Sequence, residues 1–374
     1  MQYTEYELGE LLPFEQPTAY IVKSTDYSDA YATPVLTAGK SFILGKTNET
    51  DGIFDQLPVI IFDDFTTATQ FVNFRFKVKS SAMKILHINT DLVIPKYIFY
   101  RLQIIQFDHS THKRYWIQSY SKIKVLIPPL DEQFRIVARI EELFSELDKA
   151  VDTLKTTKEQ LAVYRQAVLV DAFRVATNST HLKIGYVCAK IVDCPHSTPK
   201  WEKSGKLCLR TTNFKRGYLD LQSPNYVSEE TFHDRNRRII PQPGDVLYSR
   251  EGSVLGIACT IPSNVYPCLG QRMMLLRSGE KLNNRYLMHY LNSPMVTNHV
   301  IATKGGTGSP HINVGDIKEF QIPIPSLEEQ SNIVRQIEEQ LSSCDNVEKT
   351  VDAILTQADA MRQSILKQAF EGTL

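Results

Sequence analysis

Residues 178–323 contain several short clusters of polar side chains of the kinds that contact DNA. Arg, Lys, Thr, Asn, Gln and His donate or accept hydrogen bonds at base edges, and the cations among them also neutralise phosphates. An ordinary solvated loop carries the same residue types, so each cluster alone leaves both interpretations open. The candidate DNA contacts are Arg210, Thr211, Thr212, Asn213, Lys215, Arg216, Tyr248, Ser249, Arg250, Gln271, Arg272, Lys304, Thr307 and His311.

Two kinds of contact are expected among these cations. Arg250 follows an apolar run that predicts a strand, so we expect it in a loop at the strand end, where its forked guanidinium can bond a guanine bidentately. Lys215 and Arg216 lie in a charged turn after Asn213 and are better suited to phosphate. The sequence therefore predicts base reading at Arg250 and backbone binding at the turn.

Formal charge is distributed unevenly along the chain, although its total is zero. Residues 178–323 carry 18 Lys and Arg against 11 Asp and Glu, whereas residues 1–127 carry 13 of each. Residues 128–177 and 324–374 are both acidic. A basic segment within a neutral chain favours a nucleic-acid partner for that segment, and a solvated surface is the alternative.

Motifs for catalysis, cofactors and metals are missing from the sequence. Gly39 and Gly45, each followed by Lys and a hydroxyl residue, have five residues between them where a phosphate loop needs four. The six cysteines form no C-x-x-C pair, and Cys194 with His196 lacks a third ligand at metal spacing. We expect a protein that is not an enzyme and holds no cofactor or metal.

An internal repeat organises the chain. Residues 127–133 (IPPLDEQ) are echoed by residues 324–330 (IPSLEEQ), an offset of 197. The echo runs without a gap to Phe173 and Phe370, with 19 identities in 47 aligned pairs. The globular segments echo each other more weakly, for example at residues 97–102 and 286–291. The chain is therefore a tandem duplication of one long unit.

Each copy of the strong repeat predicts a long helix. Proline precedes its start, acids fill the first turn, and about 40 residues follow without Gly or Pro, a rod of about 60 Å. A single apolar seam at heptad spacing cannot stabilise such a rod alone, so each helix needs a partner. The predicted seams are Ile140, Phe144, Leu147, Val151, Leu154, Lys158, Leu161, Arg165 and Val168, and Ile337, Leu341, Cys344, Glu348, Val351, Leu355, Ala358, Arg362 and Ile365.

These observations predict an α+β protein of two mixed α/β globules, each followed by a long helix. The globules are expected at residues 1–127 and 178–323, with β-rich runs such as 57–62 and 244–248, and the helices at 128–177 and 324–374. The duplication predicts that the helices pair as an antiparallel coiled coil with pseudo-two-fold symmetry. A coiled-coil interaction protein without DNA function is the alternative.

These residues resemble a known family, the specificity subunits of type I restriction-modification systems. The doubled I-P-[PS]-L-[DE]-E-Q pattern before a long helix resembles the two spacer regions of that family. Residues 191–201, 244–247, 250–252, 268–273 and 310–314 are similar to one common version of its target-recognition domain. Residues 1–127 match only in general layout.

The resemblance implies that this chain recognises DNA and that other subunits carry out the chemistry. Each target-recognition domain would read one half of a split asymmetric site in double-stranded DNA, and the helices would set the number of unspecified base pairs between the halves. Two methyltransferase subunits would dock on the helices and methylate adenine, and restriction subunits would join that complex. A methyltransferase with a degenerate motif is a further alternative. Without a signal peptide or a long apolar run, the protein is expected to be soluble, cytoplasmic and without a membrane partner.

Overall fold

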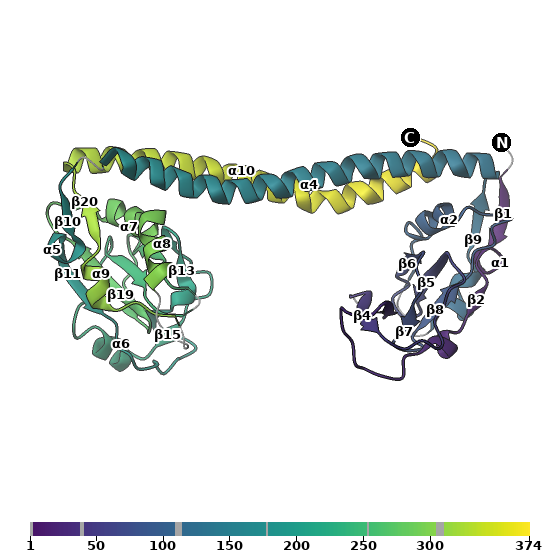
Figure 1. Ribbon diagram of the computed structural model, residues 1–374, viewed down its shortest axis with the longest axis horizontal. Helices are drawn as coiled ribbons and strands as arrows, with labels where there is room; N and C mark the ends of the chain where they lie inside the picture. The colour runs from purple at the N-terminus through teal and green to yellow at the C-terminus, as the bar shows by residue number, and fades with distance from the viewer. Residues whose placement is uncertain (1–2, 38–40, 109–113, 177–178, 253, 304–309) are drawn as a thin grey trace. The chain divides into compact units, whose positions relative to one another are not determined.

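A computed structural model describes residues 3–37, 41–108, 114–176, 179–252, 254–303 and 310–374. The contacts divide the chain into two compact units, residues 1–154 with 353–374 (unit 1) and residues 155–352 (unit 2). The long helices α4 (Leu130–Val175) and α10 (Leu327–Glu371) each contribute to both units (Figure 1). In the described part of the chain, no helix is long and apolar enough to cross a membrane.

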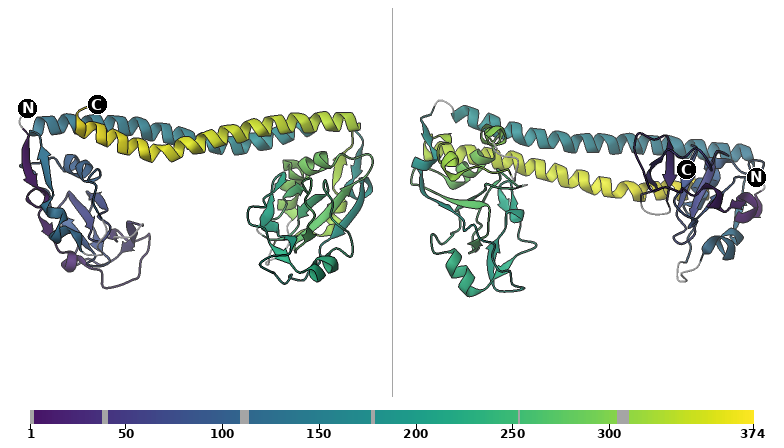
Figure 2. Two further views of the ribbon diagram at one scale, coloured as in Figure 1. Left: turned by 180° about the vertical axis from the view of Figure 1, so that it is seen from behind. Right: turned by 60° about the horizontal axis from the view of Figure 1, so that its bottom comes forward.

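The two long helices pack against each other in antiparallel directions within each unit, and both views of Figure 2 show them side by side. In unit 2, Arg165 Nη2 lies 2.6 Å from Asp345 Oδ1 and Lys158 Nζ lies 2.7 Å from Asp352 Oδ1. In unit 1, Arg362 pairs with Asp148. Every predicted seam position is buried or half-buried, which confirms the predicted heptad seams and helix pairing.

The globule of unit 1 is built on a four-stranded antiparallel sheet whose strands lie in the order β2-β8-β5-β6. A three-stranded sheet, β4-β3-β7, and a terminal pair, β1-β9, complete it, with β3 and β7 parallel. The elements are β1 (Thr4–Glu7), α1 (Leu8–Leu11), β2 (Phe14–Glu15), β3 (Thr33–Leu36), β4 (Ile43–Thr47), β5 (Val59–Asp63), β6 (Thr69–Val72), β7 (Lys77–Val78), β8 (Met83–Leu86), α2 (Pro95–Leu102), α3 (Tyr115–Gln118) and β9 (Lys124–Ile127).

The globule of unit 2 repeats this plan. Its main sheet has the order β11-β19-β16-β17, its three-stranded sheet is β15-β12-β18 with β12 and β18 parallel, and its terminal pair is β10-β20. The elements are β10 (His181–Lys183), α5 (Ile184–Val187), β11 (Cys188–Asp193), β12 (Lys206–Leu209), β13 (Phe214–Lys215), β14 (Tyr218–Leu219), β15 (Tyr226–Val227), α6 (Glu229–Arg235), β16 (Val246–Ser249), β17 (Ala258–Thr260), β18 (Cys268–Leu269), β19 (Met273–Ser278), α7 (Asn284–Asn292), α8 (Pro294–Thr303), α9 (Val314–Lys318) and β20 (Gln321–Pro323).

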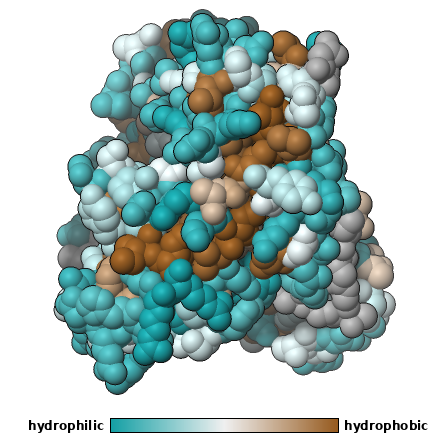
Figure 3. Space-filling view, turned by 90° about the vertical axis from the view of Figure 1, so that its left-hand side faces the viewer, coloured by the Kyte–Doolittle hydropathy of each residue, from teal (hydrophilic) through white to brown (hydrophobic). Residues whose placement is uncertain are grey.

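The strand order of the two globules therefore corresponds sheet by sheet, which extends the duplication from the helices to the weakly similar globules. The second globule adds the β13-β14 hairpin, which lies in the chain between β12 and β15 of the three-stranded sheet. The face of the molecule in Figure 3 is largely hydrophilic, with one band of apolar residues crossing it.

A buried glutamine joins each helix start to its own globule. Gln133 accepts a hydrogen bond from Ile94 N at 2.8 Å and donates to two carbonyls, one of which is Leu92 O. Gln330 accepts from Asn283 N at 2.8 Å and donates to Lys281 O and Pro325 O. Both glutamines are fully buried, so the repeated Gln of the sequence motif has a structural role at the joint.

The far end of each helix packs on the other copy's globule through an aromatic residue. Phe173, near the end of α4, contacts the rings of Tyr286 and Tyr290 of α7 at centroid distances of 5.1 and 5.0 Å. Phe370, near the end of α10, contacts the ring of Tyr97 of α2 at 5.2 Å. Each globule is thus held by the start of one helix and the end of the other, and the apolar core of each unit includes residues of both helices.

Candidate nucleic-acid interface

Five of the predicted contact residues surround one pocket of about 260 Å³ in unit 2, which we call the Trp201 pocket. Its walls come from the loops after β11, β12, β16 and β18, so distant parts of the sequence meet there. It is lined by Thr198, Trp201, Arg210, Thr211, Thr212, Glu251, Gly252, Val254, Gln271 and Arg272.

Arg210 reaches the pocket from the end of β12. The following turn is fixed by Asn213, whose Oδ1 accepts a hydrogen bond from Arg210 N at 2.8 Å and whose Nδ2 donates to Asp220 O at 3.0 Å. The Arg210 guanidinium carbon lies 5.3 Å from the centre of the Trp201 ring, within the range of a cation–π contact. Trp201 therefore supports one cation at the edge of the pocket.

Gln271 and Arg272 form the turn between β18 and β19. Gly270 is required before them, because a Cβ there would lie 2.2 Å from Leu209 O. Gln271 Nε2 donates to His196 O at 2.8 Å, and Arg272 adopts a left-handed backbone with φ of 64°. A non-glycine residue held in this conformation is uncommon and occurs often at functional sites.

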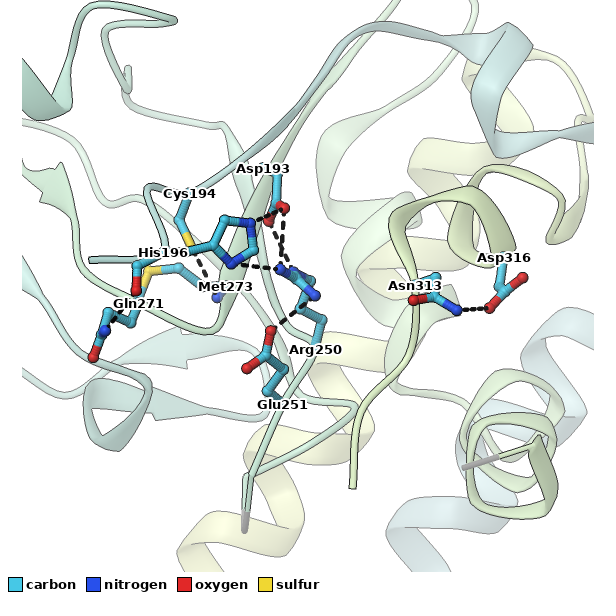
Figure 4. A network of polar contacts seen from close by, with 9 residues as sticks. All are labelled: Asp193, Cys194, His196, Arg250, Glu251, Gln271, Met273, Asn313 and Asp316. Atoms are coloured by element: carbon cyan, nitrogen blue, oxygen red, sulfur yellow. Dashed lines mark hydrogen bonds and ion pairs between the residues drawn. The ribbon is translucent and has the colours of Figure 1, made fainter. Parts of the chain in front are cut away.

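A polar network holds Arg250 beside the pocket (Figure 4). Arg250 Nε lies 2.8 Å from Asp193 Oδ1, Nη2 lies 3.0 Å from Asp193 Oδ2, and Nη1 lies 2.9 Å from Glu251 Oε1. His196 Nε2 lies 3.1 Å from Asp193 Oδ2, and its Nδ1 lies 3.4 Å from Arg250 Nη2. The Arg250 side chain is 7% exposed, and its guanidinium nitrogens bond to neighbouring residues of the globule.

Three of the predicted DNA contacts are buried in the globule. Tyr248 and Ser249 are fully buried, and Ser249 Oγ bonds to the backbone of Val254 and Ile257. Arg250 is buried and ion-paired on both sides of its guanidinium. The sequence led us to expect Arg250 in an exposed loop at the strand end, and this expected exposure is what the structure corrects, because β16 lies in the interior of the four-stranded sheet and the side chain that follows it is buried.

The remaining predicted residues differ in exposure, and two of them lie outside the described part of the chain. Lys215 on β13 and the adjacent Arg216 are exposed, and Arg216 Nη1 donates to Asn292 O at 3.3 Å. Asn213 is buried in its turn, where its side chain bonds to the backbone of Arg210 and Asp220. His311 is exposed and its backbone pairs with Glu251. Lys304 and Thr307 lie outside the described residues.

Several residues that lie in this region of the structure were not among the DNA contacts predicted from the sequence. Trp201, Asp193 and His196 lie in the segment 191–201 that carried the family resemblance, and Glu251 is the neighbour of Arg250. The motif at residues 191–201 therefore marked this segment, but it did not predict the contact between Trp201 and Arg210. Among the residues that the structure describes, no group of three or more His, Cys, Asp or Glu side chains is placed to hold a metal ion.

The thiols close to this region are poor nucleophiles. Cys194 is fully buried and accepts a hydrogen bond from Met273 N, and burial raises the pKa of its thiol. Burial likewise raises the pKa of the Cys259 thiol. Since the thiolate is the reactive form, these cysteines fit the core of the globule better than chemistry.

Comparison with known proteins supplies a family. Residues 194–357 match the family described as type I restriction modification DNA specificity domain. The chain is similar in fold to the HsdS subunit from Thermoanaerobacter tengcongensis, with a TM-score of 0.58 and 19% identity over 100% of this chain and 97% of that one. It is also similar to a chain from a structure titled as the basis of complex assembly and conformational transition of the type I R-M system, with a TM-score of 0.69 and 20% identity over 100% and 98%.

One relative is close enough in sequence to decide membership. The specificity subunit of the type I restriction enzyme EcoR124I/EcoR124II of Escherichia coli is 33% identical over 339 residues, which cover 87% of this chain and 84% of that protein. The matched region covers most of both chains and is therefore long enough to include both repeats and both globules. This chain therefore belongs to the family of type I restriction-modification specificity subunits.

Proposed function

We propose that this protein is the non-catalytic DNA-recognition subunit of a type I restriction-modification complex that acts in the cytoplasm. Residues 1–127 and 178–323 serve as target-recognition domains, each reading one half of a split asymmetric site in duplex DNA. Residues 128–177 and 324–374 serve as spacers on which two methyltransferase subunits dock. Restriction subunits join through the methyltransferase complex.

The observation that carries the proposal is the duplicated unit with unlike loops. The two globules have the same strand order and the same glutamine joint, whereas residues 178–323 carry 18 Lys and Arg against 11 Asp and Glu and residues 1–127 carry 13 of each. A repeated scaffold with different surfaces fits two readers of different half-sites. It does not fit a simple coiled-coil stalk, for which the globules would need no such difference.

Different residues of the second globule take different roles in this proposal. Arg210, Thr211, Thr212, Gln271 and Arg272 contact base edges through the Trp201 pocket, and Lys215, Arg216 and His311 contact the DNA backbone. Lys304 and Thr307 keep the DNA contact expected from the sequence. Asn213 and Arg250 act as positioning residues that hold the loops.

A domain exchange tests the proposal. Residues 178–323 are replaced by the matching segment of a relative, the chain is co-expressed with its methyltransferase subunits, and the methylated motif is read by genome methylation sequencing. One half of the motif should change while the other half stays the same. A change in both halves, or in neither, contradicts modular reading. The purified chain alone should transfer no methyl group from S-adenosylmethionine.

A further inference from the structure

The Trp201 pocket is lined by two arginines and one carboxylate, that of Glu251. A ligand of this pocket must therefore present both hydrogen-bond acceptors and a hydrogen-bond donor. We propose that the pocket reads a G·C base pair from the major groove, with Arg272 facing guanine and Glu251 facing the amino group of cytosine. The inference rests on the proposed function, because it assigns one base pair to one of the two readers.

Glu251 makes the pocket unsuitable as a phosphate site. Its carboxylate lines the pocket, is 27% exposed, and is fixed by Arg250 Nη1 at 2.9 Å. Arg250 is shared with the carboxylate of Asp193, so two acidic groups face a single arginine. A phosphate entering here would meet this carboxylate, whereas the amino group of a base would find a fixed hydrogen-bond acceptor.

Arg272 supplies a donor beside this acceptor. Among the residues that the structure describes, the exposed Arg272 guanidinium has no ion-pair partner. Gly252, with φ of +84°, directly follows Glu251, and a Cβ on Gly252 would lie 3.4 Å from Arg272 Nη1. The Arg272 guanidinium therefore lies beside the residue that follows Glu251, and both side chains line the same pocket.

This arrangement matches the major-groove edge of a G·C pair better than that of an A·T pair. Guanine presents two adjacent acceptors, O6 and N7, to an arginine fork, and its partner cytosine presents the N4 amino donor to a carboxylate. Adenine sets its N6 donor beside N7 and so opposes the second arm of the fork. Gln271, the residue type that pairs with adenine, has its amide nitrogen bonded to His196 O.

Two substitutions test the assignment. Glu251→Gln keeps an oxygen that can accept from Arg250, but it adds an amide donor opposite the cytosine amino group. Arg272→Lys keeps the charge and removes the fork. Glu280→Gln, on an exposed residue of the same globule that does not line the pocket, is the matched control. Each variant is co-expressed with the methyltransferase subunits, and the methylated motif is determined by genome sequencing.

We expect both pocket variants to relax the same G·C position in one half of the motif, with a loss of discrimination of about tenfold or more. The control should leave the motif unchanged. Retention of every base preference, or relaxation at an A·T pair, overturns the inference. So does uniform weakening at all sites with a shallower salt dependence of binding, because that result assigns the pocket to phosphate.

Failure of the proposed function has a different signature. If the wild-type chain directs no methylated motif at all, the chain is not a recognition subunit, and the pocket variants are silent for that reason. If the wild-type motif is present, the outcome concerns the pocket alone. Thermal unfolding of each variant, expected near the wild-type temperature, separates lost recognition from lost folding.

Discussion

Arg250 and Asp64 occupy corresponding places in the two globules, directly after the interior strands β16 and β5. Both are buried and both are ion-paired, but the charges are reversed. Arg250 pairs with Asp193, whereas Asp64 Oδ2 lies 3.2 Å from Lys84 Nζ and its Oδ1 accepts from Trp116 N. Removing one member of a buried ion pair leaves an uncompensated charge in the interior, so each strand end depends on both members of its pair.

Removal of Arg250 is the first prediction at this scale. Arg250→Ala leaves Asp193 and Glu251 side by side without their shared cation, and we expect unit 2 to lose about 3–5 kcal/mol of unfolding free energy. Denaturant unfolding measures the loss, with the exposed Arg210→Ala as a control that changes it by less than about 1 kcal/mol. If Arg250→Ala unfolds like the wild type but loses only target DNA, Arg250 is a base reader after all.

Glu49 gives a prediction about acid stability of the first globule. Its carboxylate accepts from Ser24 N and Lys23 N at 2.8 Å each and lies 3.0 Å from Lys77 Nζ. The hydrogen bond from Ser24, followed by that from Lys77, lowers the pKa of Glu49 from 4.5 to about 2. Because the folded pKa is the lower one, the stabilisation is present above pH 4.5 and is lost as the pH falls towards 2.

Glu49→Gln should therefore destabilise the protein at neutral pH and flatten the pH dependence of its melting temperature between about 4.5 and 2. Thermal melts across this range make the comparison, with Glu280→Gln as the control. An unchanged slope in Glu49→Gln would show that other carboxylates account for the acid sensitivity.

The long helices were predictable from the sequence because their determinants are local. Proline, acidic first turns and heptad spacing all act within a few residues, and the repeat supplied the partner. Three of the predicted seam positions, Lys158, Arg165 and Glu348, are polar, and in the structure they form ion pairs between the helices.

The sheets were not predictable in the same way. The parallel pairing of β12 with β18 places Cys208 opposite Cys268 in the sheet register, and no local pattern links these two distant parts of the chain. The run 244–248 predicted a strand, which the structure places at Val246–Ser249, but its place in the interior of a sheet depends on those distant partners. This is why the sequence led us to expect Ser249 and Arg250 at an exposed strand end, whereas both side chains are buried.

The glutamine joint carries the prediction at the scale of elements. Gln330→Leu leaves Asn283 N, Lys281 O and Pro325 O without their buried partner, and we expect a loss of about 1–3 kcal/mol or more in unfolding free energy. Gln133→Leu should have the same effect in unit 1. Gln340→Leu, on an exposed face of α10, is the control. Equal stability of Gln330→Leu and Gln340→Leu would mean that apolar packing alone forms the joint.

At the scale of the whole molecule, we propose that the length of the two helices sets the number of unspecified base pairs in the target. Inserting one heptad between Thr156 and Thr157, and another at the repeat-equivalent point between Ala353 and Ile354, preserves both apolar seams. Seven residues add about 10.5 Å of helix, which corresponds to about three base pairs of DNA at 3.4 Å each.

Methylation sequencing of the double insertion should return the same two half-sites with about three more unspecified base pairs between them. A single insertion places the two seams out of register, and we expect it to abolish methylation. An unchanged spacing in the double insertion would separate helix length from target geometry.

The ion pairs between the helices have a genetic consequence. Asp148 and Arg165 of α4 are the repeat equivalents of Asp345 and Arg362 of α10, so each helix carries both members of the pair. Two copies of the first repeat, supplied as separate chains, could form the pair twice by exchanging Asp148 and Arg165 between them. A nonsense mutation between the repeats would then leave a shortened chain that pairs with a second copy of itself. Its two identical target-recognition domains would select a DNA site whose two halves are a palindrome.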